Sequence, residues 1–506
     1  MLKESESTIF APSSLWLIAV LAIILACGLG VRLYDLKDPP LDYAASRQLR
    51  SARIARGKYY RIAQDVPEWK REVALRQGKH AIIEPTVMET IVAGTYWLVG
   101  GEHVWIARIY SSLFWVIGGV AVYALAKEMT SVDGGVIGLT YYLFSPFGMV
   151  SSRSFQPDPL MTVSIVFAWW TFYRWHKTHT WKWAIFAGLT AGFAMFVKAT
   201  AVFFLLGGFG ALILLSMGIQ KSLRDKQVWC IGLLAGLPVL LYHMYGLFVV
   251  GTLAKQFSGR FFPHHLINPE FYGQLIDTIS TVIGHELILI ITLLGIFFLK
   301  DKISRGFLLG IGGGYIIYIL IFSYHAITHS YYHLPVIPFS AILIASFSSY
   351  ILNSWSGKVV TNLFRLGLVL TVLLGVGGGY FWFHSQDFRH EPGWYWDVAN
   401  KVSRDKSIAV LSQNYGNRIA YYGWIKPKVW LEVKDQRHAE QQGADSDPFQ
   451  EAFQDFISGV DYFIITNLQE LRRQEKLHDK LYNTYSIHAE GGGFVIFDLN
   501  QPIYDE

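Results

Sequence analysis

The sequence predicts a helical polytopic membrane protein with a small α/β domain at its C-terminal end. Of its 506 residues, 52% are hydrophobic and only 16% are charged, whereas about a quarter of the residues of an ordinary soluble domain are charged. Many apolar runs approach the roughly 20 residues that a helix needs to cross a bilayer. From residue 384 onward such runs are missing. These three observations exclude a wholly soluble globular protein.

Eleven apolar runs predict about eleven transmembrane helices. The first extends from Ser14 to Val31 and has no convincing cleavage site, so we expect an uncleaved first span rather than a signal peptide. The others lie near residues 104–126, 134–150, 159–175, 181–197, 199–217, 228–250, 277–299, 305–323, 334–352 and 362–383.

The charge of the short connectors predicts the orientation in the membrane. Cytoplasmic loops concentrate Lys and Arg close to the ends of the helices. Four alternate connectors are basic: Arg174–Lys182, Lys221–Lys226, Lys300–Arg305 and Lys358–Arg365. We therefore expect these connectors inside, and the loop 35–103 and the C-terminal part outside. The loop is longer than the roughly 60 residues over which the rule operates, so its arginines do not decide the orientation.

Two further helices are expected in the loop 35–103. Counting residues 84–101 as a span would invert the charge pattern, so this apolar segment is interpreted as a helix at the outer membrane interface. An earlier segment, after Asp42, combines an apolar stripe with arginines at spacings of three: Arg47, Arg50, Arg53 and Arg56. Such a guanidinium face can bind the phosphate group of a lipid, which makes Arg47, Arg50 and Arg53 candidate phosphate or headgroup contacts. General attraction to anionic headgroups explains them equally well.

The region 384–506 differs from the rest of the chain in charge and in periodicity. It contains 13 Lys and Arg against 19 Asp and Glu, a net charge of −6, whereas the remainder carries +11. We therefore expect a transmembrane module over residues 1–383 and an extracytoplasmic α/β domain over 384–506. Strands are expected at 407–411, 429–433, 462–466 and 494–498, and helices at Pro448–Ile457 and Leu468–Tyr482. Gly491–Gly493 precede a strand and are interpreted as a tight turn.

Four charged residues near expected helix ends could carry chemistry. Asp158 lies between two prolines at the outer end of a span, where a carboxylate is costly unless it faces water or a cation. Lys198 is a lone cation that either extends to the surface or holds an anion. Asp42 and Glu84 lie in the outer loop. For Asp42 and Asp158 the alternative is an ordinary helix N-cap, and Arg153 could pair with Asp158.

Three histidines recur at intervals of four, His325, His329 and His333. On a helix this spacing could bind a divalent metal ion, but hydrogen-bonding or phosphate-contacting histidines are the favoured interpretation because no accompanying metal motif is present. The two cysteines, Cys27 and Cys230, lie in apolar runs and indicate no disulfide framework.

Several short motifs occur in a specific order: L-D-Y-A-A with Asp42, E-P-T-V from Glu84, A-R-I-Y-S-S-L with Arg108, S-R-S-F-Q-P-D-P-L-M with Asp158, G-L-T-A-G-F-A-M-F-V-K with Lys198, and Y-Y-H-L-P-V-I-P. In this order the sequence resembles the polyprenyl-phosphate-sugar-dependent glycosyltransferases of the GT-C fold, over roughly residues 14–352. The nearest branch resembles the dolichyl-phosphate-mannose protein mannosyltransferases and the lipid A aminoarabinose transferases.

This resemblance implies inverting transfer of a sugar from a lipid-linked phosphate donor to an acceptor hydroxyl on the outer face of the membrane. It implies that Asp42 is the general base and that Asp158 shapes the catalytic site. Glu84, Arg108, Arg153, Lys198, Tyr332 and His333 would contact the donor or its phosphate. The implied partners are the donor, a glycolipid, glycan or protein acceptor, and membrane lipids, without nucleic acid; a divalent metal ion stays open.

The sequence departs from the family pattern in ways that leave the substrate undefined. The usual acid pair after the first span is Asp42 followed by Tyr43, and the double proline is reduced to Glu84 and Pro85. The absence of any N-glycosylation sequon indicates a bacterial source and hence an inner membrane. A transporter or lipid flippase, and a non-catalytic relative that binds polyprenyl phosphate, are the alternative functions.

Overall fold

The computed structural model describes residues 8–78, 84–251, 253, 261–355, 357–441 and 448–503. Their contacts divide the chain into two units. Unit 1 comprises residues 1–36, 82–87 and 107–385, and unit 2 comprises residues 37–81, 88–106 and 386–506. The boundary after Ser385 lies two residues from the expected one. The contacts group most of the outer loop with the C-terminal region, because helices of the loop pack against that region.

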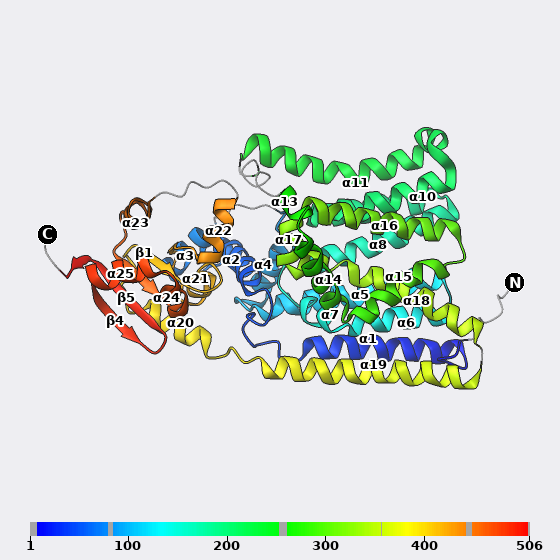
Figure 1. The fold of residues 1–506 in the computed structure, drawn as a ribbon, viewed down its shortest axis with the longest axis horizontal. Coiled ribbons are helices and arrows are strands. Elements are labelled where there is room, and N and C mark those ends of the chain that lie inside the picture. The colour runs from blue at the N-terminus through cyan, green and yellow to red at the C-terminus, as the bar shows by residue number, and fades with distance from the viewer. Residues whose placement is uncertain are drawn as a thin grey trace. The chain divides into compact units, whose positions relative to one another are not determined.

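Unit 1 is helical. Its helices are α1 (Ser14–Leu33), α5 (Trp105–Met129), α6 (Val132–Phe144), α7 (Pro146–Ser151), α8 (Pro157–Thr178), α9 (Trp181–Val197), α10 (Ala201–Arg224), α11 (Lys226–Met244), η1 (Tyr245–Val249), α13 (Pro263–Leu266), α14 (Pro269–Ile283), α15 (Glu286–Gly295), η2 (Ile296–Phe298), α16 (Lys302–Ile321), α17 (Ser323–Thr328), η3 (Ser330–His333), α18 (Val336–Ser354) and α19 (Lys358–Ser385). The first and last of the long helices, α1 and α19, run side by side (Figure 1).

The helical membrane architecture is confirmed. Within the described residues, seven helices are long and apolar enough to cross a membrane: α1, α5, α10, α11 with η1, α16, α18 and α19. The pair α14 and α15 would add an eighth span, with a bend of 85°. Every expected run contains helix, but α8 is less apolar and α9 is shorter than these spans.

Two expected continuous spans are interrupted for identifiable reasons. The run 134–150 divides into α6 and α7 at Ser145–Pro146, because proline lacks the N–H of a helical hydrogen bond and its ring clashes with the preceding turn. The run 277–299 divides at Gly284, whose φ of +114° is a left-handed conformation that favours glycine.

Unit 2 combines helices of the outer loop with a five-stranded sheet. The loop contributes α2 (Ala45–Ile62), α3 (Glu68–Gly78) and α4 (Val87–Val99). The C-terminal region contributes α20 (Glu391–Ala399), β1 (Ile408–Leu411), α21 (Asn417–Tyr422), β2 (Lys428–Val429), α22 (Val433–Gln441), α23 (Phe449–Ile457), β3 (Tyr462–Ile465), α24 (Leu468–Arg473), α25 (Glu475–Thr484), β4 (Tyr485–Gly491) and β5 (Phe494–Pro502).

The sheet has the strand order β2-β1-β3-β5-β4. Strand β1 is parallel to β2 and β3, whereas β5 is antiparallel to β3 and β4. Three expected strands are confirmed as β1, β3 and β5. The expected strand 429–433 is wrong beyond its first residue, because the chain leaves the sheet after Val429 and enters α22. Strand β4 was missed, and the glycines before β5 form the turn of the β4–β5 hairpin.

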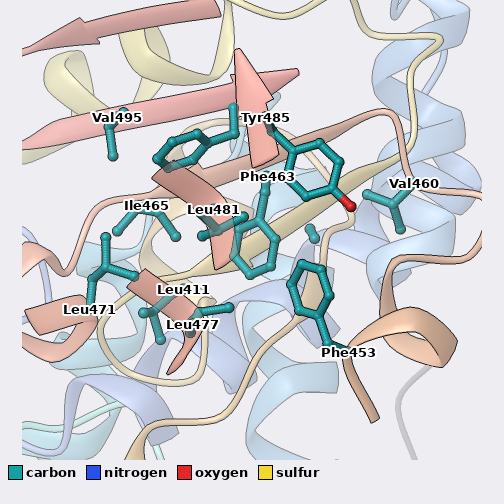
Figure 2. Packing of buried hydrophobic residues seen from close by; sticks show 12 residues of the cluster. Leu411, Phe453, Val460, Phe463, Ile465, Leu471, Leu477, Leu481, Tyr485 and Val495 are labelled. Atoms are coloured by element: carbon teal, nitrogen blue, oxygen red, sulfur yellow. The ribbon is translucent and has the colours of Figure 1, made fainter. Parts of the chain in front are cut away.

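Successive side chains of each strand point to opposite faces of the sheet, and helices bury both faces. On one face, side chains such as Leu411, Phe463 and Ile465 pack against α23, α24 and α25, and Figure 2 shows this cluster. On the other face, Val410 and Ile464 pack against α20 and α21. Because helices cover both faces, these strands are short continuous apolar runs, and their alternation with amphipathic helices is what predicts an α/β domain from the sequence.

Within unit 1, glycines allow α10 and α16 to approach closely, as small residues do in membrane helix pairs. A Cβ atom on Gly314 would overlap the carbonyl oxygen of Phe203, whereas a Cβ atom on Gly313 would have no neighbour within 4 Å. We expect Gly314→Ala to destabilise the purified protein by about 1–3 kcal/mol, seen as a lower thermal unfolding midpoint in detergent. Gly313→Ala, the matched control, should keep or raise the midpoint. Equal midpoints for the two variants would contradict this packing.

Candidate functional site

Three charged side chains from separate parts of the chain meet in unit 1. Asp158 lies in the first turn of α8, and Lys198 follows the last residue of α9. The Nζ atom of Lys198 lies 2.7 Å from Oδ1 of Asp158 and 3.7 Å from Oε1 of Glu84. Asp158 is 0% exposed and Lys198 is 3% exposed. Lys198 is therefore held in the interior by carboxylates and does not extend to the protein surface.

The start of α8 differs from the expected cap. Gln156 is the N-cap residue, and Pro157 rather than Pro159 opens the helix. Proline suits this position because the first N–H of a helix has no intrahelical acceptor. The N-cap interpretation of Asp158 is therefore wrong, and its carboxylate contacts Lys198.

Two tyrosines of η3 also lie beside Lys198. Its Nζ lies 4.5 Å from the ring centroid of Tyr332 and 5.5 Å from that of Tyr331. The aromatic faces attract the ammonium group. Tyr332, an expected site residue, thus belongs to the Lys198 cluster, and Tyr331 joins it although the sequence analysis did not select it.

Both ring nitrogens of His333 form hydrogen bonds within the protein, so neither is available to bind a metal ion. Its Nε2–H donates to the carbonyl oxygen of Ala326 at 2.6 Å, and its Nδ1 accepts from the hydroxyl of Tyr315. Burial lowers the pKa of His333 to about 4, so the ring is neutral at pH 7. Helix α17 ends at Thr328, so the three histidines do not share one helix. In the part of the chain that the structure describes, no group of three or more His, Cys, Asp or Glu side chains could hold a metal ion.

Arg108 and Arg153 converge on the end of α1. Arg153 donates to the carbonyl oxygens of Tyr34 and Asp35 at 2.8 and 3.0 Å. Arg108 donates to those of Asp35 and Leu36 at 3.4 and 3.2 Å. These carbonyl groups belong to the residues that directly follow α1, and the hydrogen bonds to them offset part of the cost of burying the two guanidinium groups.

The sequence analysis missed a third buried arginine. Arg32, in the last turn of α1, donates to Ser152 and to the carbonyl oxygens of Gly28 and Leu143, each at 2.7 Å. These bonds connect α1 with α6 and with the loop before α8. A lone arginine at the end of the first apolar run was the available signal, because a charge there is costly unless its partners are provided.

In unit 2, Asp42 precedes α2 on a short turn. The N-cap residue of α2 is Ala44, with φ of +42°, so the N-cap interpretation of Asp42 is wrong. The Nε2 atom of Gln48 donates to the carbonyl oxygen of Tyr43 at 2.6 Å and to Oδ1 of Asp42 at 3.3 Å. Asp42 is half-buried. Alanine in a left-handed conformation is strained, and such strain concentrates at functional sites.

The arginines of α2 are less exposed than the expected guanidinium face requires. Arg47 and Arg50 are half-buried, whereas Arg53 is 6% exposed and donates to Oδ1 of Asn417 at 2.8 Å. Burial, together with the charges of Arg56 and Arg50, lowers the pKa of Arg53 to about 10, which still leaves it charged at pH 7.

Arg56 anchors α2 within unit 2. It forms an ion pair with Glu102 at 3.0 Å and donates to the carbonyl oxygen of Tyr421 at 2.7 Å. Its guanidinium lies 3.8 Å from the ring centroids of both Tyr421 and Trp424. Burial is the largest single influence and lowers the pKa of Arg56, but Glu102, Tyr421 and Tyr60 together outweigh burial and raise it. Gln77 of α3 adds bonds to the carbonyl oxygens of Ala420 and Ile425.

The expected site residues thus fall into two groups. Glu84, Arg108, Arg153, Asp158, Lys198, Tyr332 and His333 belong to unit 1, and Asp42, Arg47, Arg50 and Arg53 belong to unit 2. Within unit 1, Glu84, Asp158, Lys198 and Tyr332 come together.

Comparison with known proteins shows which fold carries these residues. Residues 84–245 match the family of dolichyl-phosphate-mannose-protein mannosyltransferases. The structure is similar to that of ArnT from Cupriavidus metallidurans bound to undecaprenyl phosphate, with a TM-score of 0.59 and 14% identity over 96% of this chain and 98% of that chain. The chain has the GT-C fold. The sequence-based resemblance is thereby confirmed at the level of fold.

A second similar structure with this fold is the archaeal oligosaccharyltransferase AglB from Archaeoglobus fulgidus, in complex with an inhibitory peptide and a dolichol-phosphate. Its TM-score is 0.55 and its identity 13%, over 95% of this chain and 74% of that chain. No curated protein sequence matches significantly. In this GT-C chain, the segment that matches the mannosyltransferase family contains Glu84, Arg108, Arg153, Asp158 and Lys198, whereas Asp42 precedes it and Tyr332 and His333 follow it.

Proposed function

We propose that this protein transfers a sugar from a polyprenyl-phosphate-linked donor to an acceptor hydroxyl, with inversion at the anomeric carbon. The observation that carries this proposal is the buried ammonium group of Lys198, held by Asp158 and Glu84 beside two tyrosines. A buried ion pair seldom adds stability over an apolar pair of similar volume, so its presence favours a role in binding or catalysis.

Lys198 is proposed to stabilise the phosphate of the donor. When the glycosidic bond breaks, negative charge develops on the phosphate oxygen that leaves, and a cation fixed in a low-dielectric site stabilises that charge strongly. Asp158 and Glu84 keep the ammonium group charged and oriented before the donor binds. The comparison proteins ArnT and AglB, solved with undecaprenyl phosphate and dolichol-phosphate, support a lipid phosphate as the ligand class.

Asp42 is proposed to be the general base. The oxygen of the acceptor hydroxyl forms a bond to the anomeric carbon while the bond from that carbon to the phosphate oxygen breaks. The hydroxyl proton passes to the carboxylate of Asp42, and polyprenyl phosphate leaves with the electron pair. Attack opposite to the leaving phosphate inverts the anomeric configuration. Gln48, which donates to Asp42 and to the backbone beside it, orients the carboxylate.

The basic connectors support a reaction on the outer face of the membrane. The acceptor would be a lipid, glycan or protein carrying a free hydroxyl. Unit 2, with its half-exposed Asp42, would then face the periplasm or the exterior.

The proposal is tested by supplying purified protein with undecaprenyl-phosphate sugars and a panel of hydroxyl acceptors in nanodiscs. We expect release of undecaprenyl phosphate that depends on the acceptor, and a product of inverted anomeric configuration by NMR. Movement of the labelled lipid across liposome membranes without any cleavage of the sugar–phosphate bond would instead indicate a flippase and overturn the proposal.

A further inference from the structure

A buried glutamine at the start of α8 has no side-chain partner among the residues that the structure describes. Gln156 is 0% exposed, and neither its Oε1 nor its Nε2 forms a hydrogen bond with any described residue. As the N-cap residue of α8 it also makes no side-chain capping bond. Burying an amide without hydrogen bonds costs free energy, so a group of this kind needs an explanation.

A second unsatisfied group lies on the same helix. Thr162 is 0% exposed, and its Oγ1 has no hydrogen-bond partner among the described residues. Threonine in a helix usually donates to the carbonyl oxygen four residues earlier, as Thr140 of α6 does to Val136 at 2.8 Å. Thr162 follows Asp158 by four residues, so the two lie on one face of α8, about one turn apart.

Along the chain, the two unsatisfied groups lie on either side of Asp158, whose carboxylate contacts Lys198. Gln156 precedes Asp158 by two residues and Thr162 follows it by one turn. The ligand that satisfies them must both donate and accept hydrogen bonds, because an amide presents a carbonyl oxygen as well as an N–H group. The oxygens of a phosphodiester only accept, whereas each hydroxyl of a sugar donates and accepts.

We propose that Gln156 and Thr162 form a subsite that binds hydroxyl groups of the sugar carried by the donor lipid. This inference rests on the proposed function, since the sugar is bonded directly to the phosphate and must therefore lie next to the cation that binds it. Sites that hydrogen-bond a substrate hydroxyl through buried groups discriminate strongly against ligands that lack it. The pair therefore contributes to the choice of sugar, and Lys198 to the binding of phosphate.

The test compares the affinity for bare undecaprenyl phosphate with that for undecaprenyl phosphate carrying glucose, mannose, galactose or 4-amino-4-deoxyarabinose. Wild type, Gln156→Leu and Thr162→Val are purified as full-length protein in nanodiscs. We expect wild type to prefer at least one sugar-bearing lipid over the bare lipid. Each substitution should lower that preference roughly fivefold to tenfold and leave the affinity for the bare lipid unchanged.

Thr140→Val is the matched control, because it removes a buried helical hydroxyl that already has a backbone partner; its sugar preference should equal that of wild type.

Thermal unfolding without ligand distinguishes a role of Gln156 in binding from a role in stability. Leucine at position 156 removes an unsatisfied amide at similar volume, so we expect an unchanged or higher midpoint. A lower midpoint with unchanged sugar preference would mean that the amide is satisfied by internal water, and would overturn the inference.

The outcomes also separate this inference from the proposed function. Binding of the bare lipid together with the same sugar preference in wild type and both variants would overturn the sugar subsite alone. A wild type that prefers no sugar-bearing lipid would do the same. Absence of any binding of bare or sugar-bearing lipid would overturn the proposed function, and the sugar subsite with it.

Discussion

Replacing Asp42 by asparagine is expected to reduce the rate of sugar transfer by about a hundredfold to ten-thousandfold, the usual contribution of a general base. Asparagine has nearly the same shape and can still accept the hydrogen bond from Gln48, but its amide cannot take the proton of the acceptor hydroxyl. The measurement is single-turnover release of undecaprenyl phosphate. The affinity for the donor should stay within about twofold of wild type, since the change removes an interaction made only in the transition state.

Asp65→Asn is the matched control for this substitution. Asp65 is an exposed residue of unit 2 with φ of +55°, a conformation that asparagine tolerates, so both stability and turnover should equal those of wild type. Full turnover by Asp42→Asn, with an unchanged dependence on pH, would remove Asp42 from the role of base and point to another carboxylate.

Replacing Lys198 by methionine is expected to abolish turnover and to destabilise the fold. Methionine fills a similar volume but removes the ammonium group that lies 2.7 Å from the fully buried Asp158. Breaking a buried ion pair from one side costs about 3–5 kcal/mol, so the thermal unfolding midpoint in detergent should fall clearly. Lys182→Met makes the same substitution at an exposed position and should change neither property.

A double variant separates the two effects of Lys198. Adding Asp158→Asn to Lys198→Met removes both charges of the pair, so part of the lost stability should return. Turnover should not return, because no cation would stabilise the phosphate as it leaves. If the double variant recovered wild-type turnover together with stability, the pair would have only a structural role and the proposed phosphate contact would be wrong.

Secondary structure that depends on short stretches of the chain was predictable from the sequence. Long apolar runs predicted helices and short apolar runs predicted β1, β3 and β5, because both signals depend only on consecutive residues. The breaks at Ser145–Pro146 and Gly284 were visible as residues, but whether a proline or glycine bends a span or is absorbed into it depends on the packing around it. Strand β4 was missed although Tyr485, Ile487 and Ala489 alternate with polar residues; it is an edge strand whose residues are mostly exposed or half-buried.

The candidate residues were largely identifiable, whereas their partners were not. A lone Lys198 between apolar runs and an Asp158 between prolines are conspicuous in the sequence, since charge at membrane depth is costly. Their pairing across 40 residues, the hydrogen bonds of Arg108 and Arg153 to the end of α1, and the burial of Arg53 against Asn417 follow only from the fold.

The sequence by itself determined that this chain is a helical membrane protein with an acidic α/β domain, and that several of its charged residues, Asp158 and Lys198 among them, needed an explanation. Hydropathy, periodicity and charge are properties of consecutive residues, so folding does not alter them. Only the tertiary structure decided which carboxylates hold Lys198, that His333 is hydrogen-bonded within the protein, and that no described residue bonds the side chain of Gln156. The reason is that burial and hydrogen bonding depend on segments far apart in the chain, which no local pattern specifies.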